Sequence, residues 1–114
     1  MKLEEFSQDD FERASKRLVR SLTRGKTSSS QPKAILLGGQ SGAGKTTIHR
    51  VKQREFQGNI IIIDGDSYRS FHPNYLTLQE KYGKDSVDYT KVFAGRMVEY
   101  LVDELSKQGY HLLI

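Results

Sequence analysis

The stretch "AILLGGQSGAGKTTIHR", residues 34–50, decides the fold. It opens with an apolar run that predicts a short strand over Ala34–Leu37, and it passes through a glycine-rich turn at residues 38–44. The residues that follow predict a helix over Thr46–Phe56. A strand, a tight turn and a helix in this order are typical of a parallel α/β sheet.

The turn contains "GQSGAGKT", residues 39–46, which fits the pattern G-x-x-x-x-G-K-[ST] at every fixed position. Glycines let the backbone wrap closely around a phosphate, so that several N–H groups and the helix N-terminus meet the anion together. In such loops the lysine reaches the β- and γ-phosphates, and the hydroxyl of the next residue binds Mg²⁺. The alternative is a glycine-rich turn with an incidental lysine. The predicted nucleotide contacts are Gly39, Gln40, Ser41, Gly42, Ala43, Gly44, Lys45, Thr46 and Thr47, with Thr46 also a metal ligand.

Two carboxylates follow the next predicted strand, Asn59–Ile63, which reads as buried on both faces. In open α/β sheets this end of a strand faces the ligand crevice. Asp64 after four isoleucines is typical of a Mg²⁺ ligand, whereas Asp66 is placed to accept the proton of an attacking hydroxyl. Either aspartate can instead cap the loop through its own backbone. The residues alone leave these alternatives open.

The N-terminal part predicts a helix over residues 3–24, in which Phe6, Phe11 and Leu18 recur at helical spacing and Ser7 with Asp10 caps the start. Residues 25–33 are rich in serine and predict a linker. We therefore expect one domain over residues 1–114, made of this helix, the linker and the α/β part.

The C-terminal part predicts polar loops over "DGDSYRSFHPNY" and around "KYGKDSVDYT", then a helix over Val92–Lys107 that stops near Gly109. The predicted apolar face of this helix comprises Val92, Phe93, Met97, Val98, Leu101, Val102 and Leu105. The last residues, "GYHLLI", predict a strand that has just begun. The order gives β-α-β-α-β in a parallel sheet with flanking helices, and we expect the chain to be part of a longer domain.

The charge and the composition of the chain limit the kinds of partner that we expect it to bind. The chain has 18 Lys and Arg against 14 Asp and Glu, a formal charge of +4, and the charges are interspersed. Interspersed charge is typical of a solvated surface, so we expect no nucleic-acid partner. The sequence has no cysteine, no signal peptide and no apolar run long enough for a membrane span, so we expect a cytoplasmic protein without a membrane partner.

The residues favour a small-molecule phosphotransferase, because the Asn-Lys-x-Asp run with which a GTPase reads its base is missing from these residues. Beyond that, "AILLGGQSGAGKTTIHR", "QGNIIIIDGDSYRSFHPNY", "YGKDSVDYTKVFAGRMVE" and "LSKQGYHLLI" together resemble the zeta toxin family of bacterial toxin–antitoxin systems, in particular its PezT-type members. The resemblance covers the whole chain. It implies a P-loop kinase fold that uses ATP and Mg²⁺ to phosphorylate the 3′-hydroxyl of UDP-N-acetylglucosamine, and a small helical antitoxin as partner.

Carried over to this sequence, the resemblance implies that Lys45 and Thr46 hold the phosphates and Mg²⁺. It makes Asp66 the catalytic base and Glu99 a contact to the substrate sugar. Glu99 on a solvated helix face is the plain alternative. The loop after Asp66 would place His72 and Tyr75 along the substrate cleft, although His72 before a proline is also an ordinary loop residue.

The resemblance stops where the chain stops. Family members continue past the "LLI" strand into a substrate-contacting turn, lid arginines that neutralise the transferring phosphate, and strands that hold adenine. Arginines of this kind raise phosphoryl-transfer rates by several powers of ten. We therefore expect these 114 residues alone to have little kinase activity and marginal stability. The alternatives are a P-loop kinase for another hydroxyl, such as a nucleoside, an antibiotic or a polynucleotide end, and an inactive fragment that binds nucleotide or antitoxin.

Overall fold

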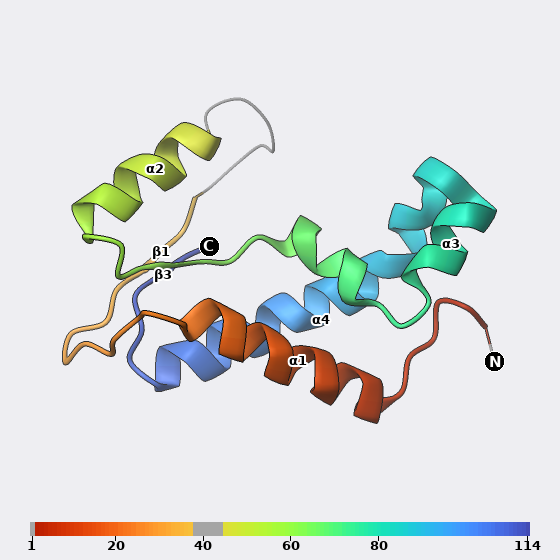
Figure 1. Cartoon of the computed structure of the whole chain (residues 1–114), viewed down its shortest axis with the longest axis horizontal. Coiled ribbons are helices and arrows are strands. Elements are labelled where there is room, and N and C mark those ends of the chain that lie inside the picture. The colour runs from red at the N-terminus through yellow and green to blue at the C-terminus, as the bar shows by residue number, and fades with distance from the viewer. Residues whose placement is uncertain (1, 38–44) are drawn as a thin grey trace. The chain divides into compact units, whose positions relative to one another are not determined.

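The computed structural model describes residues 2–37 and 45–114. The chain divides into two compact units, one made of Met1–Leu18 and Asp64–Leu101 and the other of Val19–Ile63 and Val102–Ile114. The elements in chain order (Figure 1) are α1 (Gln8–Thr23), β1 (Ala34–Ile35), α2 (Lys45–Glu55), β2 (Ile61–Ile62), the 3₁₀ helix η1 (Gly65–Phe71), α3 (Tyr75–Tyr82), the 3₁₀ helix η2 (Gly83–Asp85), α4 (Ser86–Lys107) and β3 (Leu112–Leu113).

The second unit contains a three-stranded sheet in the order β1-β3-β2, and both pairings are parallel. Leu112 pairs with Ala34 on one side and with Ile61 on the other. Leu112 and Leu113 are buried, as expected for a central strand of a parallel sheet covered on its faces. The predicted α/β class with a parallel sheet is confirmed.

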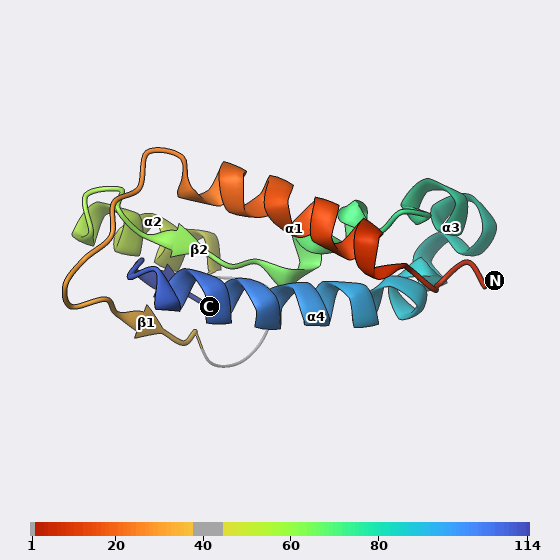
Figure 2. The same ribbon diagram turned by 90° about the horizontal axis from the view of Figure 1, so that it is seen from below.

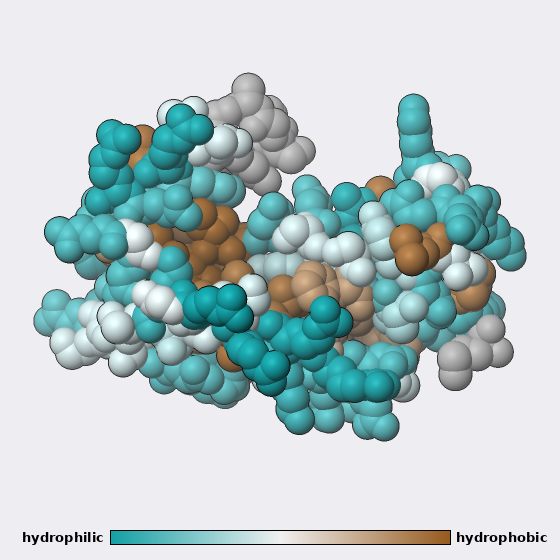
Figure 3. Space-filling model, in the orientation of Figure 1, coloured by the Kyte–Doolittle hydropathy of each residue, from teal (hydrophilic) through white to brown (hydrophobic). Residues whose placement is uncertain are grey.

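The strands are shorter than predicted. The ladders end at Ile35 and Ile62, although single hydrogen bonds continue beyond them, from Leu37 N to Ile114 O (2.7 Å) and from Ile63 N to Leu113 O (2.8 Å). The isoleucine run is buried except for the half-buried Ile62. Leu36 is 75% exposed, and Figure 3 shows apolar surface over the strands of this unit.

The segment between α1 and β1 is irregular, as the predicted linker requires, and it is fixed by side-chain hydrogen bonds. Asn59 bonds to both backbone groups of Thr27, since its Oδ1 accepts from Thr27 N (2.8 Å) and its Nδ2 donates to Thr27 O (3.1 Å). Gly109 ends α4 with a φ of +88°, and a Cβ there would lie 3.1 Å from Ser29 O. Glycine at this helix end is therefore required by both backbone and packing.

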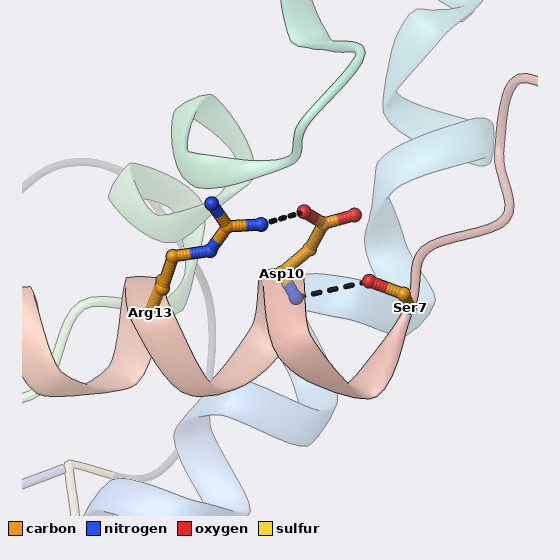
Figure 4. Close-up of polar contacts among 3 residues, drawn as sticks. All are labelled: Ser7, Asp10 and Arg13. Carbon is orange, nitrogen blue, oxygen red and sulfur yellow. Dashed lines mark hydrogen bonds and ion pairs between the residues drawn. The ribbon is translucent and has the colours of Figure 1, made fainter.

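The first unit begins with the capped start of α1 (Figure 4). Ser7 Oγ accepts a hydrogen bond from Asp10 N (3.0 Å), as predicted, and Asp10 in turn accepts from Arg13 (2.9 Å). The cap places the first helical residue at Gln8 rather than at residue 3. The outward side of α1 is hydrophilic (Figure 3).

Aromatic rings form the core of the first unit, where α1 lies along α4 (Figures 1 and 2). Phe93 of α4 is fully buried, and its ring contacts Phe6 edge-on at 5.0 Å and Phe11 at 5.8 Å between centroids. Edge-to-face aromatic pairs of this spacing add to the burial of their area. The residues buried along α1 are Phe11, Ala14, Ser15 and Leu18.

Three expectations for residues 64–107 were wrong. The stretch predicted as a first polar loop is helical over η1, because Asp64 caps it, and apart from this cap residue His72–Asn74 stay outside a helix. The second predicted loop contains the end of α3, all of η2 and the start of α4, which begins at Ser86 instead of Val92. Val92 is 61% exposed and does not belong to the buried face of α4. Within the described part of the chain, no helix has the length and apolarity that crossing a membrane requires.

Candidate functional site

The phosphate-binding part of the predicted site lies largely outside the described residues. This holds for Gly39, Gln40, Ser41, Gly42, Ala43 and Gly44. Helix α2 begins at Lys45, immediately after these residues, and Thr46 and Thr47 are exposed on its first turn. The helix start therefore falls where the sequence motif requires it, with the free N–H groups of the first turn available to an anion.

The two aspartates after β2 differ in what their side chains do. Asp64 caps η1, since its Oδ1 accepts from Asp66 N at 3.3 Å while its carbonyl oxygen accepts from Ser67 N (3.2 Å) and Ser67 Oγ (2.7 Å). The capping alternative weighed for Asp64 is thus observed. Asp66 uses its backbone carbonyl to accept from Arg69 Nε (3.2 Å), and its carboxylate is exposed to solvent.

Asp66 lines a groove of about 220 Å³ between η1 and α4 in the first unit. Gly65 and Arg69 accompany it on η1, and the α4 side is formed by Val87, Lys91, Ala94, Gly95 and Val98. The two elements approach closely because Gly65 has no side chain, as a Cβ there would lie 3.1 Å from Val98 Cγ2. The lining of the groove thus combines one carboxylate, that of Asp66, and two cationic side chains with an apolar floor.

Tyr68 is the buried residue of η1. Its ring is 3% exposed, and its hydroxyl makes no hydrogen bond to any described residue. Burial raises the pKa of Tyr68 to about 12, and the nearby charge of Asp64 adds to the rise. The hydroxyl therefore stays protonated at neutral pH.

The predicted substrate residues are not all gathered at this groove. Glu99 is exposed on α4 four residues after Gly95, hence one turn further along the same face. His72 is buried instead, with Nε2 3.0 Å from Glu4 O and Nδ1 accepting from Asn74 N (3.0 Å). Both ring nitrogens of His72 thus hold the N-terminal segment and the turn before α3.

Tyr75 begins α3, and its hydroxyl accepts from Gln79 Nε2 (3.0 Å). It is half-buried and does not line the Asp66 groove. Sequence reasoning missed Arg69, Lys91 and Gly95, which do line it. The signal that was available is a glycine in the middle of an otherwise regular helix.

Comparison with known proteins gives consistent results. The family model described as zeta toxin matches residues 18–114. The chain is 68% identical over its whole length to the toxin PezT of Streptococcus pneumoniae serotype 4, of which it covers 45%. It is 38% identical over 110 residues to a zeta toxin of Streptococcus agalactiae, covering 38% of that protein. The chain thus spans less than half the length of these relatives.

A solved structure from the PezAT chromosomal toxin–antitoxin system of Streptococcus pneumoniae superposes on the chain with a TM-score of 0.97. The two sequences are 68% identical, and the superposition covers all of this chain and 47% of the other. At this identity, the similarity extends from the fold to the arrangement of the elements that carry the site.

Proposed function

Because the chain belongs to the zeta toxin family, we propose that it carries the N-terminal part of an ATP-dependent kinase, the toxin of a toxin–antitoxin system. The proposed reaction transfers the γ-phosphoryl group of ATP to the 3′-hydroxyl of UDP-N-acetylglucosamine in the cytoplasm. The observation that carries the proposal is the exposed carboxylate of Asp66 at a groove, together with a helix that starts at the lysine of a phosphate-binding motif.

Asp66 acts as the general base in this proposal. Its carboxylate accepts the proton of the acceptor hydroxyl while the hydroxyl oxygen bonds to the γ-phosphorus and the bond to the ADP oxygen breaks. An exposed carboxylate that accepts no side-chain hydrogen bond within the described chain is free to take this proton. Lys45 balances the negative charge of the phosphates. Glu99, one turn along α4 from the groove, is the proposed second contact to the acceptor sugar.

The donor set fits Mg²⁺. Thr46 and Asp64 both offer exposed oxygen atoms, and Mg²⁺ prefers oxygen ligands and keeps several of its waters. One Asp64 oxygen is engaged in the η1 cap, which leaves the other available, directly or through water. When bound, the ion neutralises charge on the β- and γ-phosphates. Among the described residues no three acidic or histidine side chains cluster, so we propose the nucleotide phosphates as its other ligands.

The proposed protein partner is a small helical antitoxin. The relatives named above support this partner, because the superposed structure comes from a toxin–antitoxin system. We propose that the antitoxin covers the nucleotide site, as the family resemblance implies. In this proposal the antitoxin suppresses the kinase by competing with ATP.

Incubation with ATP, Mg²⁺ and a panel of hydroxyl acceptors tests the function. We expect the protein that carries this sequence to phosphorylate UDP-N-acetylglucosamine at the 3′-hydroxyl, identified by ³¹P and ¹H NMR of the product. Preferred transfer to a nucleoside, an antibiotic or a polynucleotide end would show that the acceptor is not UDP-N-acetylglucosamine. Binding of ATP without transfer to any acceptor would instead leave a nucleotide-binding module.

A further inference from the structure

The size of the Asp66 groove limits what it can hold. Its volume of about 220 Å³ is below the roughly 300–1,000 Å³ of sites that enclose a whole small-molecule ligand. The groove therefore fits one part of a larger acceptor, on the scale of a single sugar ring. Its apolar floor of Val87, Ala94 and Val98 suits the carbon face of such a ring.

Gly95 lies in the middle of α4 and lines this groove. Glycine in a helix interior is less stable than alanine, so its presence calls for a reason. A Cβ at Gly95 would meet no described atom within 4 Å, and its φ is not positive. Neither packing nor backbone conformation within the described chain therefore requires glycine here, in contrast to Gly65.

The charged side chains of the groove point to the rest of the ligand. Arg69 and Lys91 both line it, and Asp66 is the acidic residue among the lining side chains. Lys91 is loosely held, since its Nζ lies 4.0 Å from Asp88 Oδ1 and its side chain is 67% exposed. A cation that is weakly paired within the protein is available to an anionic ligand group.

We infer that Gly95 is a specificity-determining residue, whose missing side chain leaves room for the acceptor's sugar ring against α4. The ring presents its hydroxyl to Asp66, and a phosphate group of the same acceptor contacts Lys91. The inference rests on the proposed kinase function and names the acceptor class as a phosphate-bearing sugar. Lys91 and Gly95 act on binding of the acceptor and not on ATP.

Gly95→Ala in the protein that carries this sequence tests the steric part. We expect the melting temperature to stay the same or rise, because alanine favours the helix. We expect the KM for the phosphate-bearing sugar to rise about tenfold, since a methyl group overpacks the contact, while the KM for ATP is unchanged. A fall in melting temperature with an unchanged acceptor KM would assign the glycine to packing and overturn the inference.

Lys91→Ala tests the charge, and Lys107→Ala is its matched control. Lys107 is an equally exposed lysine of the same helix (68% against 67%), paired with Asp103 at 3.0 Å, and it does not line the groove. We expect Lys91→Ala to raise the acceptor KM about fivefold at low salt and less at high salt, with Lys107→Ala unchanged. Equal effects of the two variants would overturn the assignment of Lys91.

The two levels of the proposal fail in different ways. A wild-type protein that transfers phosphate to no hydroxyl acceptor would overturn the kinase function and this inference with it. A wild-type protein that phosphorylates the sugar, with Gly95→Ala and Lys91→Ala both retaining the wild-type KM, would overturn this inference alone.

Discussion

At the scale of single residues, two aspartates separated by one glycine have different environments. Asp64 uses its carboxylate to start η1, whereas the carboxylate of Asp66 lies exposed at a groove. The cap is local chemistry, because an aspartate before a tight helical turn accepts the N–H two residues on. By fixing the first turn of η1, Asp64 positions the backbone of Asp66.

Tyr68, two residues after Asp66, gives a prediction about stability. Its buried hydroxyl lacks a hydrogen-bond partner among the described residues, so Tyr68→Phe removes an unpaired polar group and keeps the ring. We expect the variant to raise the free energy of unfolding by about 1 kcal/mol at pH 7, measured by urea denaturation. Tyr100→Phe, at a residue that is 37% exposed, is the control and should change little.

The same residue predicts a loss of stability in alkali. Its folded-state pKa of about 12 lies above the ordinary value of 10.0. As the pH rises through 10, the unfolded chain gives up this proton while the folded chain keeps it, so the free energy of unfolding falls between pH 10 and 12. Tyr68→Phe should lose this part of the fall and Tyr100→Phe should keep it. Identical slopes for the two variants would contradict the burial of the hydroxyl.

At the scale of elements, α4 links the core of the first unit to the groove. One side of the helix carries the buried Phe93, Met97 and Leu101, and another carries Lys91 and Gly95 at the groove. The 3.6-residue period separates the two sets on the helix surface. A change on one side is therefore expected to leave the other side intact.

Neighbouring residues of α4 test this division. Phe93 is fully buried against Phe6 and Phe11, so Phe93→Ala should lower the free energy of unfolding by about 3–5 kcal/mol. Val92 is 61% exposed, and Val92→Ala should change it by less than about 0.5 kcal/mol. Chemical denaturation of both variants measures the difference. Equal losses of unfolding free energy in the two variants would mean that Val92 belongs to the buried face, as the hydrophobic pattern predicted.

The start of α4 explains why part of the fold escaped prediction. Its buried positions begin with Ser86 and Thr90, four residues apart, and Thr90 Oγ1 bonds to Ser86 O at 3.3 Å. A threonine whose hydroxyl donates to a carbonyl of its own helix can be buried without the apolar residues that a periodicity search detects. Helix α3 was missed for a related reason, because Leu78 is its one buried residue.

The β-α-β order, by contrast, followed from strongly apolar strands and from a motif with fixed spacing. The aspartates after the isoleucine run carry a local signal for a ligand crevice, and the family resemblance singled out Asp66 between them. Lys91 and Arg69 carry none, and the mid-helix Gly95 does not by itself indicate which element it faces, since the three residues share a site only through the packing of η1 on α4. Contacts between elements distant in sequence are fixed by tertiary structure and are not written in any short pattern.

At the scale of the whole molecule, the chain holds two units that contribute different chemistry. The phosphate-binding motif and the parallel sheet belong to the second unit, and Asp66 with its groove belongs to the first. In the proposed reaction, Lys45 and Thr46 act on ATP and Asp66 acts on the acceptor. The two functions are therefore expected to separate in variants.

The most direct test of this account compares Asp66→Asn with Lys45→Ala in phosphoryl transfer and in ATP binding. Asparagine removes the base at nearly constant size, so we expect the transfer rate to fall by about 10²–10⁴-fold while the Kd for Mg·ATP stays within about twofold of wild type. Lys45→Ala should impair both transfer and binding. If Asp66→Asn instead weakened Mg·ATP binding tenfold and only modestly slowed transfer, Asp66 would be a metal ligand and the proposed mechanism would be wrong.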